Sequence, residues 1–464
     1  MIRVAIVGGG ISGLSAAFYL DKARRAGAQI NYTLFECASR AGGVIQTETS
    51  HGFVIEAGPD SFLTAKPWAA ELAKELGIDD QIFGSNDATR KTYILLRGRL
   101  VPMPDGLQMM VPTKILPIAT SQLFSWQAKI RMAREYISPP KPLAAGEDES
   151  VASFVTRHLG AEVTEKLAIP LLAGVYGGNA SRLSVRAVLP RFVEMEAESR
   201  SLVRGVLSAK KKSGGVAQAP LFSSFNLGMQ QLVDALIGRL VGAAVRTGVA
   251  VKRIEKAGAA SLSTWRVTMA DGSWEIFDHI IVATPAYVAA ELLGTVDAQL
   301  CKLLGEIQYS SSITVAVAYA AGAPVPRGFG FLVPRSEGIP IVAATFVQNK
   351  FKHRVPAGST LLRLFLTEAI DWTDEKIGGV VMEKVASILR ITAKPTEMRI
   401  FRWARSMPQY EVGHLDRIAA IDKLVAKHAG LELIGSAYRG IGVPDCVREG
   451  KEAACRVMKG FLAH

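Results

Sequence analysis

Three glycines near the start of the chain have the spacing of a phosphate-binding turn. Gly8, Gly10 and Gly13 follow an apolar run, residues 2–7, and precede a helical pattern that continues to about Arg25. In this pattern the first glycine makes a tight turn, the second admits a pyrophosphate, and the third lets the helix pack on the strand. The N–H groups at the helix N-terminus then bind the phosphates. The spacing therefore predicts a dinucleotide site.

An acidic residue stands where a βαβ unit of this kind places one. Residues 30–35 are predicted to form the second strand, and Glu36 follows them, 23 positions beyond Gly13. Its carboxylate can accept hydrogen bonds from ribose hydroxyls and would repel the 2′-phosphate of NADP. A tight structural turn is the alternative for the glycines alone. The strand, the helix and the acid together favour nucleotide binding.

The elements that must position this site come from distant parts of the chain. Helical patterns dominate over residues 65–204, strand-like runs follow at 243–256 and 265–283, and residues 311–370 alternate like strands. A last strand, 431–436, leads through a glycine turn into a helix. For 464 residues, about three structural units are expected. The predicted fold class is α/β (α+β), with a Rossmann-type nucleotide-binding domain, a mixed-sheet domain and an inserted α-helical domain.

Composition excludes several classes of protein. With 49% hydrophobic and 21% charged residues, the chain is predicted to be globular rather than disordered or fibrous. The four cysteines have no CxxC pairing and the histidines have no metal-ligand spacing, so neither a disulfide framework nor a metal site is expected. The chain opens at Met1 without the pattern of a signal peptide, and no apolar run is long enough to span a bilayer.

The excess of positive charge, +12 for the whole chain, is concentrated in two stretches. Residues 90–141 carry nine Lys or Arg against two acids, and residues 182–212 carry eight against three. Apolar residues, including Ile115, Leu116 and Trp126, are interleaved with the first stretch. This mixture predicts contact with an anionic membrane or an acidic ligand, with a solvated basic face as the alternative. Nucleic acid is not expected, because no nucleic-acid module surrounds the cations.

A second glycine motif follows Glu36 closely. The sequence Arg-Ala-Gly-Gly at 40–43 resembles the element that distinguishes the monoamine oxidase-like FAD enzymes from simple NAD dehydrogenases. Near the other end, the run from Gly435 to Val443 matches the place where these flavoproteins close the FAD site with a second helix N-terminus. The resemblance therefore reaches both ends of the chain.

Four motifs between these ends resemble the oxygen-dependent porphyrinogen oxidase family, which includes protoporphyrinogen oxidases and coproporphyrinogen III oxidases. The motifs are EAGPDSF at 56–62, LAGVYGGN at 172–179, GFGFLVP at 328–334 and MPQYEVGH at 407–414. The resemblance covers essentially the whole chain. It implies FAD-dependent six-electron oxidation of a porphyrinogen in haem biosynthesis, from protoporphyrinogen IX to protoporphyrin IX or from coproporphyrinogen III to coproporphyrin III, with oxygen or another acceptor.

Carried over residue by residue, the resemblance implies two sets of site residues. Non-covalent FAD would be bound by Gly8, Gly9, Gly10, Ile11, Ser12, Gly13, Glu36, Arg40, Gly43, Gly58, Pro59, Asp60, Ser61, Val251, Ser436, Ile441, Gly442 and Val443. The porphyrinogen would occupy a flat apolar slot beside Gly174 and Gly177, with Leu332 and Phe365 sandwiching the macrocycle. No general base is implied, because the cofactor carries the chemistry. His414 is expected to form a structural hydrogen bond.

One position departs from the family's pattern. Eukaryotic members have an arginine that pairs with a substrate propionate where this chain has Thr92. Propionate binding is therefore left to the cations at 90, 91, 97 and 99, with Arg97 and Arg99 as candidate substrate residues. Whether the substrate is the dicarboxylate protoporphyrinogen or the tetracarboxylate coproporphyrinogen stays open.

The resemblance also implies domain boundaries, a location and partners. An FAD-binding domain is expected at 1–64, 222–300 and 430–464, a substrate-binding domain at 65–85 and 301–429, and a helical membrane-binding domain at 86–212. The protein is expected to be cytoplasmic, peripherally associated with the inner face of the cell membrane, and a monomer or homodimer. Ferrochelatase or other haem-pathway enzymes are the expected protein partners.

Two alternatives compete with this function. A flavin amine oxidase or a carotenoid desaturase could use the same fold, because fold alone does not fix the substrate. The motifs at 174–179 and 408–414 disfavour this alternative, as do the clustered cations over 90–99 on the expected substrate side. The second alternative is a non-catalytic flavoprotein or membrane-associated scaffold. Reduction of the bound flavin by a porphyrinogen would exclude it.

Overall fold

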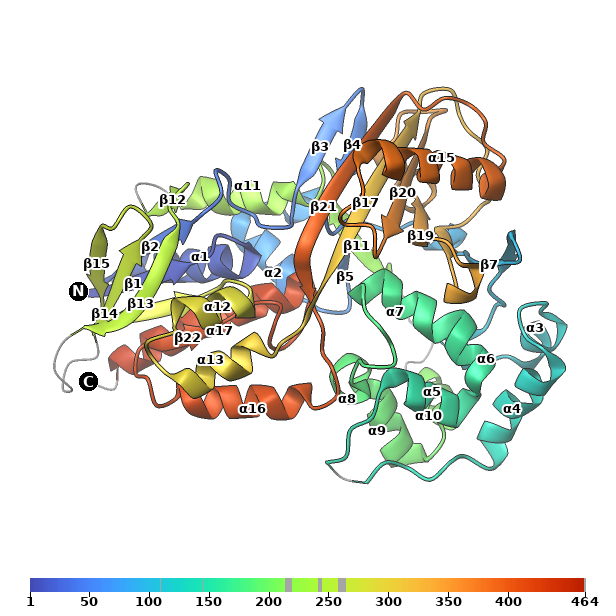
Figure 1. Cartoon of the computed structure of the whole chain (residues 1–464), viewed down its shortest axis with the longest axis horizontal. Coiled ribbons are helices and arrows are strands. Elements are labelled where there is room, and N and C mark those ends of the chain that lie inside the picture. Colours follow the sequence, from blue (N-terminus) through green and yellow to red (C-terminus); the bar gives the residue numbers. More distant parts are fainter. Residues whose placement is uncertain (109, 145, 213–218, 241–243, 258–263, 463–464) are drawn as a thin grey trace.

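The computed structural model describes residues 1–464 except 109, 145, 213–218, 241–243, 258–263 and 463–464 (Figure 1). The sequence predicts a Gly/Ser/Ala-rich loop between Lys212 and Pro220, and residues 213–218 of that loop lie outside the description. Figure 1 shows three parts: the part that is predicted to bind a nucleotide, which carries both chain ends, a part built on a second large sheet, and a group of helices beneath that sheet.

The N-terminal βαβ unit is confirmed at almost the predicted positions. It consists of β1 (Ile2–Val7), α1 (Ile11–Arg25) and β2 (Ile30–Glu36). These strands belong to a five-stranded sheet in which every neighbouring pair is parallel. Its strand order is β12 (Val245–Thr247), β2, β1, β16 (His279–Val282) and β22 (Leu431–Leu433).

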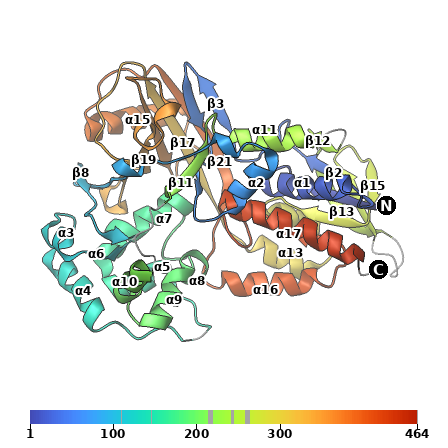
Figure 2. The same ribbon diagram turned by 180° about the vertical axis from the view of Figure 1, so that it is seen from behind.

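Helices cover both faces of the five-stranded sheet because its strands are apolar on both faces. On β1, Val4 and Ile6 pack toward one layer, whereas Ala5 and Val7 pack toward the other. The first layer, seen in Figure 2, contains α1, α2 (Trp68–Leu76), α11 (Gln230–Arg239) and α17 (Val443–Leu462). The second contains α12 (Ala286–Leu292), α13 (Ala298–Gly305), α16 (His414–Val425) and the antiparallel strands β13 (Val251–Ala257), β14 (Thr264–Met269) and β15 (Trp274–Phe277).

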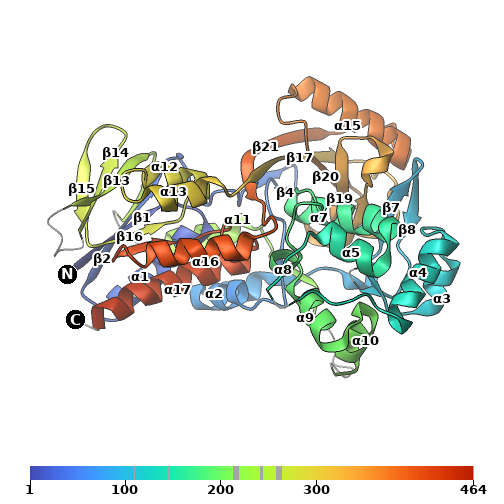
Figure 3. The same ribbon diagram turned by 60° about the horizontal axis from the view of Figure 1, so that its bottom comes forward.

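The second large sheet has seven strands and is mixed. Its order is β21 (Glu397–Pro408), β17 (Tyr309–Tyr319), β20 (Thr360–Leu366), β19 (Ile341–Phe346), β18 (Gly330–Leu332), β7 (Thr92–Leu96) and β8 (Arg99–Pro102). Helix α15 (Asp374–Leu389), which Thr373 caps, packs on one face through its buried apolar side chains. Figure 3 shows α15 on this face and α7 (Ile169–Tyr176) on the opposite one.

The helical group lies against the end of this sheet that carries β7 and β18. It contains α3 (Ile115–Thr120), α4 (Trp126–Ile137), α5 (Val151–Leu159), α6 (Ala161–Val163), α7, α8 (Val185–Val188), α9 (Pro190–Ser199) and α10 (Leu202–Lys212). A π-helical segment, η3 (Thr164–Ala168), joins α6 to α7. The helices share one apolar core, to which Ile94 of β7 also belongs. Within the described residues, no helix is both long and apolar enough to cross a bilayer.

Short elements connect these three parts. They are the hairpins β3 (Thr47–Ser50) with β4 (Phe53–Glu56) and β9 (Leu107–Gln108) with β10 (Val111–Pro112), the small sheet of β5 (Phe62–Leu63), β11 (Phe222–Phe225) and β6 (Ile82–Gly84), the helix α14 (Val347–Lys350), and the 3₁₀ turns η1 (Asp79–Gln81), η2 (Asp87–Thr89), η4 (Arg335–Glu337) and η5 (Lys352–Arg354).

The packing of three sets of elements differs from the expected domain boundaries. Helix α2, expected in the substrate domain, packs with α1 and α17, because its apolar residues recur at one-turn spacing and fit that layer. Strands β7 and β8, expected in the helical domain, pair with the seven-stranded sheet. Helix α16, expected in the substrate domain, and helix α13, which crosses the expected boundary between 300 and 301, bury their apolar faces against the five-stranded sheet.

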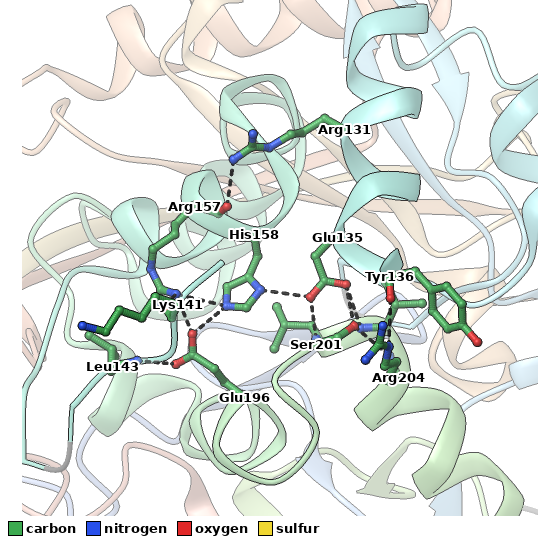
Figure 4. Close-up of polar contacts among 12 residues, drawn as sticks. Arg131, Glu135, Tyr136, Lys141, Leu143, Arg157, His158, Glu196, Ser201 and Arg204 are labelled. Carbon is green, nitrogen blue, oxygen red and sulfur yellow. Dashed lines mark hydrogen bonds and ion pairs between the residues drawn. The ribbon is translucent and has the colours of Figure 1, made fainter. Parts of the chain in front are cut away.

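A buried polar network holds four helices of the helical group together (Figure 4). His158 on α5 lies between two carboxylates, with Nδ1 3.0 Å from Glu135 of α4 and Nε2 2.9 Å from Glu196 of α9. Glu135 also accepts the Leu202 N–H of α10 at 2.7 Å and the Ser201 hydroxyl at 2.8 Å. Each ring nitrogen lies within hydrogen-bond distance of a carboxylate, so the imidazole links α5 to both α4 and α9.

Candidate functional site

At each of the three glycines in the turn after β1, a different structural reason favours glycine over other residues. Gly8 has a φ of +110°, and a Cβ there would lie 2.8 Å from the Ala283 carbonyl oxygen. A Cβ on Gly13 would overlap the Gly8 carbonyl oxygen, which shows how closely α1 packs on the turn. A Cβ on Gly10 would meet no protein atom within 4 Å. The open space at Gly10 therefore lies where a pyrophosphate is predicted, at the N-terminus of α1.

The first turn of α1 is open to such a ligand. Gly10 is the N-cap residue and no side chain caps the helix, while Ile11 and Ser12 begin it. Uncapped N–H groups at a helix N-terminus favour an anion through hydrogen bonds and the helix dipole. The predicted residues from Gly8 to Gly13 thus form one continuous cradle.

Glu36 closes one side of the glycine turn. Its Oε2 accepts the Gly9 N–H at 2.7 Å and its Oε1 accepts the Ala38 N–H at 2.8 Å. The Glu36 carbonyl accepts the Val249 N–H at 2.9 Å, which brings the start of β13, with Val251, to the same edge. The start of β13, with Val251, therefore lies beside the end of β2, with Glu36, which agrees with the predicted adenosine site.

The Arg-Ala-Gly-Gly segment packs directly on the first turn. The Gly42 N–H donates to the Gly9 carbonyl at 2.8 Å, and a Cβ on Gly43 would lie 3.4 Å from Gly10 Cα. The Arg40 guanidinium donates to the carbonyls of Ala41 and Ile45, at 3.0 and 3.1 Å. Arg40 thus stabilises its own turn, and the turn limits the space beside Gly10.

Residues of the MPQYEVGH motif support the C-terminal turn. The Tyr410 hydroxyl donates to the Ser436 carbonyl at 2.6 Å and accepts the Gly440 N–H at 2.8 Å. His414 stacks on Tyr410 with centroids 4.0 Å apart, and its Nε2 lies 3.1 Å from the Tyr438 carbonyl. Burial lowers the pKa of His414 to about 4, so the neutral ring donates this structural hydrogen bond. Ile441 and Gly442 then lead into α17, which begins at Val443.

The EAGPDSF segment enters the site from β4. A Cβ on Gly58 would overlap the Val44 carbonyl oxygen, so only glycine fits there. The Gly58 carbonyl accepts a hydrogen bond from Arg363 of β20 at 2.6 Å. Pro59 follows, and Ser61 donates to the Asp60 carboxylate at 2.6 Å. This segment is therefore the point at which the nucleotide-binding part contacts the seven-stranded sheet.

The predicted substrate residues lie on the sheet face opposite α15. Cross-strand pairing joins Leu332 to Ala343 and Ala343 to Phe365, which places the three side chains in one row. Helix α7 approaches this row, since a Cβ on Gly174 would lie 3.6 Å from Leu332 and 3.7 Å from Ala343. A Cβ on Gly177 would lie 3.2 Å from the Ser310 hydroxyl. The four predicted residues thus come from one sheet face and the helix facing it.

Sequence motifs alone did not identify every member of this row. The pairing continues from Leu332 to Ile94 of β7 and from Phe365 to Thr314 of β17. Ala343 lies at its centre and is 6% exposed. Strand alternation predicts which residues share a face, but not which strands become neighbours, so Ala343, Ile94 and Thr314 required the sheet order.

The two candidate propionate-binding arginines lie away from the row. Arg97, with a φ of +50°, and Gly98 form the tip of the β7–β8 hairpin, where both N–H groups donate to Glu337. Arg99 pairs with Leu96, so both arginines lie beyond Ile94 along the hairpin. In the described chain, neither guanidinium forms a hydrogen bond or ion pair. Their role toward a propionate stays a prediction.

Together these residues fit FAD. An open cradle at Gly10, an acid at the adenosine edge and a second helix N-terminus at Val443 match the parts of a dinucleotide, and the segment 58–61 leads from them to the Leu332–Phe365 row. Apolar surfaces of this kind can bind a planar macrocycle, and Arg363 links this one to the segment 58–61.

Comparisons with known proteins agree with this arrangement. The family described as flavin containing amine oxidoreductase matches residues 11–458. The coproporphyrinogen III oxidase of Bacillus subtilis is 34% identical, with 97% of each chain covered, and the protoporphyrinogen oxidase of Bos taurus is 30% identical, with 98% of each covered. A solved structure from Exiguobacterium sp. 255-15, provisionally named a protoporphyrinogen oxidase, has a TM-score of 0.87 at 29% identity, with 98% of each chain covered. The chain therefore belongs to the family of flavin-containing amine oxidoreductases.

Proposed function

We propose that this protein is an FAD-dependent porphyrinogen oxidase of haem biosynthesis. The observation that carries the proposal is the row Leu332–Ala343–Phe365, which faces Gly174 and is joined through Arg363 to the segment 58–61 of the nucleotide-binding part. Full-length relatives named coproporphyrinogen III oxidase and protoporphyrinogen oxidase support the choice of a porphyrinogen over an amine.

The chain's own residues have binding and orienting roles in this proposal. FAD, when bound non-covalently, supplies the electron acceptor for three successive two-electron oxidations. In this proposal the apolar row holds one face of the macrocycle near Phe365, and the close packing of Gly174 of α7 on Leu332 and Ala343 excludes water from the other end of the row. Arg97 and Arg99, at the hairpin tip, are the proposed partners of the substrate carboxylates. Oxygen is the proposed final acceptor.

The direct test is porphyrin fluorescence over time. Purified holoenzyme is supplied with oxygen and, in parallel, protoporphyrinogen IX or coproporphyrinogen III, because relatives with both names are similar to this chain. We expect rapid fluorescence with at least one substrate, and the faster one identifies the pathway position. Fluorescence no faster than autoxidation without enzyme, despite bound FAD, would contradict the proposal, and an amine assay would then test the alternative. Oxygen consumption in the same samples tests the acceptor.

We further propose that the helical group binds the inner face of the cell membrane. Both faces of α4 carry apolar residues: Ala128 and Met132 are buried in the helical core, whereas Trp126 and Ile130 are 69% and 65% exposed. Ile115 of α3 is 89% exposed. Cations accompany this outer face, including Lys129, whose ammonium lies 4.4 Å from the Trp126 ring centroid. An exposed apolar face with cations suits insertion among anionic headgroups.

Membrane binding is expected to depend on charge and salt. The double variant Lys114→Glu, Arg134→Glu should bind phosphatidylglycerol vesicles at least about tenfold more weakly, because each cation near such a surface contributes about 1 kcal/mol and each reversal also adds repulsion. Salt should weaken binding of the unmodified protein. Lys252→Glu on β13, in the nucleotide-binding part, is the matched control. Vesicle sedimentation measures the effect, and equal binding of all three proteins would refute the proposed surface.

A further inference from the structure

A buried cluster of charged side chains joins the segment 56–61 to the elements around β20. The cluster contains two carboxylates and three cations: Glu56, Asp60, Lys350, Arg354 and Arg363. The side chains of Glu56, Arg354 and Arg363 are 1%, 1% and 3% exposed. Charges at such depth are costly unless they are paired and hydrogen-bonded. The cluster therefore fixes the position of the segment 56–61 relative to the elements around β20.

Asp60 is the centre of the cluster. Lys350 of α14 donates to its two carboxylate oxygens at 3.0 and 2.9 Å, and Arg363 Nη1 lies 3.2 Å from Oδ2. Arg354 donates to the Asp60 carbonyl at 3.1 Å and pairs with Glu56 at 2.9 Å. Burial alone would raise the pKa of Asp60, but Lys350 and Arg363 hold it well below its usual range. The carboxylate thus stays ionised near neutral pH.

Arg363 differs from the other two cations in what else it touches. Besides Asp60, it donates through Nη2 to the Gly58 carbonyl at 2.6 Å. Its guanidinium carbon also lies 5.1 Å from the ring centroid of Phe365, two residues along β20 on the same face. One planar side chain therefore contacts both the EAGPDSF segment and the apolar row.

We propose that Arg363 is a positioning residue that sets the placement of the Phe365 wall relative to the cofactor-side segment Gly58–Asp60. The proposal rests on the proposed function, in which FAD lies along 58–61 and the porphyrinogen lies on Phe365. A guanidinium can donate to a carboxylate and a carbonyl from one rigid fork while its face lies against a ring, and a lysine ammonium cannot reproduce that geometry. Flavin and macrocycle must be aligned for reaction, so displacement of either lowers the rate.

The chain offers a matched pair of variants. Arg363→Met and Lys350→Met each remove one buried cation from Asp60, and in each the carboxylate keeps the other cation as a partner. Lys350→Met also removes the hydrogen bond from Lys350 to the Ser61 hydroxyl, at 3.1 Å, but Ser61 keeps its hydrogen bond to Asp60. Only Arg363→Met removes the contacts to Gly58 and Phe365. A role in charge pairing alone predicts equal effects, whereas positioning predicts a larger effect for Arg363→Met. Arg363→Lys keeps the positive charge but lacks the planar guanidinium. The positioning hypothesis therefore predicts the same effects for Arg363→Lys as for Arg363→Met.

Three measurements on the FAD-loaded proteins decide between these hypotheses. They are the visible circular dichroism of the flavin, the change in flavin absorbance when the product porphyrin is added, and KM and kcat for the porphyrinogen. For Arg363→Met and Arg363→Lys we expect an altered flavin signal, a weakened porphyrin-induced change and kcat/KM at least about tenfold lower. Lys350→Met should keep the flavin signal, with kcat/KM within about threefold of the unmodified protein.

Equal effects of Arg363→Met and Lys350→Met on all three measurements would overturn the proposal. If Arg363→Met does not fold, Arg363→Lys provides the test. A flavin signal, porphyrin response and KM equal to those of the unmodified protein would also overturn the proposal. The failure of the proposed function is distinguishable, because no variant and no unmodified protein would then oxidise a porphyrinogen. The flavin dichroism of the Arg363 and Lys350 variants would still show whether Arg363 positions the segment beside FAD.

Discussion

Gly10→Val is expected to give a folded protein that contains no FAD. Gly10 has a φ of −69° and a ψ of 176°, which valine tolerates, and a Cβ there meets no protein atom within 4 Å. The valine side chain would instead fill the space at the α1 N-terminus in which the pyrophosphate is predicted. The ratio of flavin absorbance to protein absorbance in the purified variant measures the loss, and porphyrinogen oxidation should fall to background.

A matched control separates loss of FAD from loss of fold. Gly379 of α15 also has no protein atom within 4 Å of an added Cβ, so Gly379→Val should keep a full flavin content. Circular dichroism should show native helix content in both variants. A normal flavin ratio in purified Gly10→Val would contradict the assignment of the glycine cradle, because no pyrophosphate could then lie against Gly10.

His158→Ala is expected to destabilise the helical group by about 3 to 5 kcal/mol, because it removes two hydrogen bonds to buried carboxylates and each such bond contributes about 1.5 to 3 kcal/mol. The substitution removes the His158 hydrogen bonds from Glu135 Oε1 and Glu196 Oε1, which then keep only the Leu202 N–H and Arg157 Nη1 as donors, and all three side chains are at most 2% exposed. Because the network joins α4, α5, α9 and α10, the loss should spread over the helical group. Urea denaturation followed by Trp126 fluorescence, the only tryptophan between Pro102 and Lys212, measures it.

A surface pair provides the control for this variant. His51 lies 3.7 Å from Glu397, but its side chain is 74% exposed, so His51→Ala should change stability by no more than about 1 kcal/mol. Similar urea midpoints for His158→Ala and the unmodified protein would show that the network contributes little.

The same network makes the stability of the helical group depend on pH in the acidic range. Burial would raise the pKa of Glu135 and Glu196, but hydrogen bonds from His158 and from Ser201 or Arg157 outweigh burial and lower both pKa values below 4.5. A carboxyl group with a lowered folded-state pKa stabilises the fold fully above its unfolded pKa and loses this effect as pH falls through the folded pKa. The stability of the helical group should therefore decrease below about pH 4.5, and less steeply in His158→Ala.

Local patterns predicted the nucleotide-binding part well. The glycine turn, the strand before it and Glu36 lie within 36 residues, and their geometry is set by backbone rules that act over short distances. Arg40 shows the limit of a local motif. Its position beside the turn was predicted, but its hydrogen bonds to the carbonyls of Ala41 and Ile45 depend on how the following residues fold back.

The rest of the site depends on strand neighbours that no local pattern specifies. Helix α2 has a clear apolar face, but the spacing of its apolar residues does not specify which layer that face covers, and only the packing with α1 and α17 shows it. Strand β7 pairs with β18, more than 230 residues later, which moved residues 92–102 out of the expected helical domain. The contact of Arg363 with Gly58 joins residues 305 positions apart. Such contacts follow from tertiary packing rather than from propensity.

The strand order of the five-stranded sheet also determines when the protein can fold during its synthesis. Strand β22 and helix α17 come from the last part of the chain, and they complete the sheet beside β16 and the layer over α1. The nucleotide-binding domain therefore cannot finish folding until β22 and α17, which follow β16 only after a long intervening segment, have left the ribosome. Pairing over such sequence separations is slow and leaves apolar strand edges exposed in the meantime. Nascent chains should need chaperone protection until α17 emerges, and flavin loading should follow the synthesis of that helix.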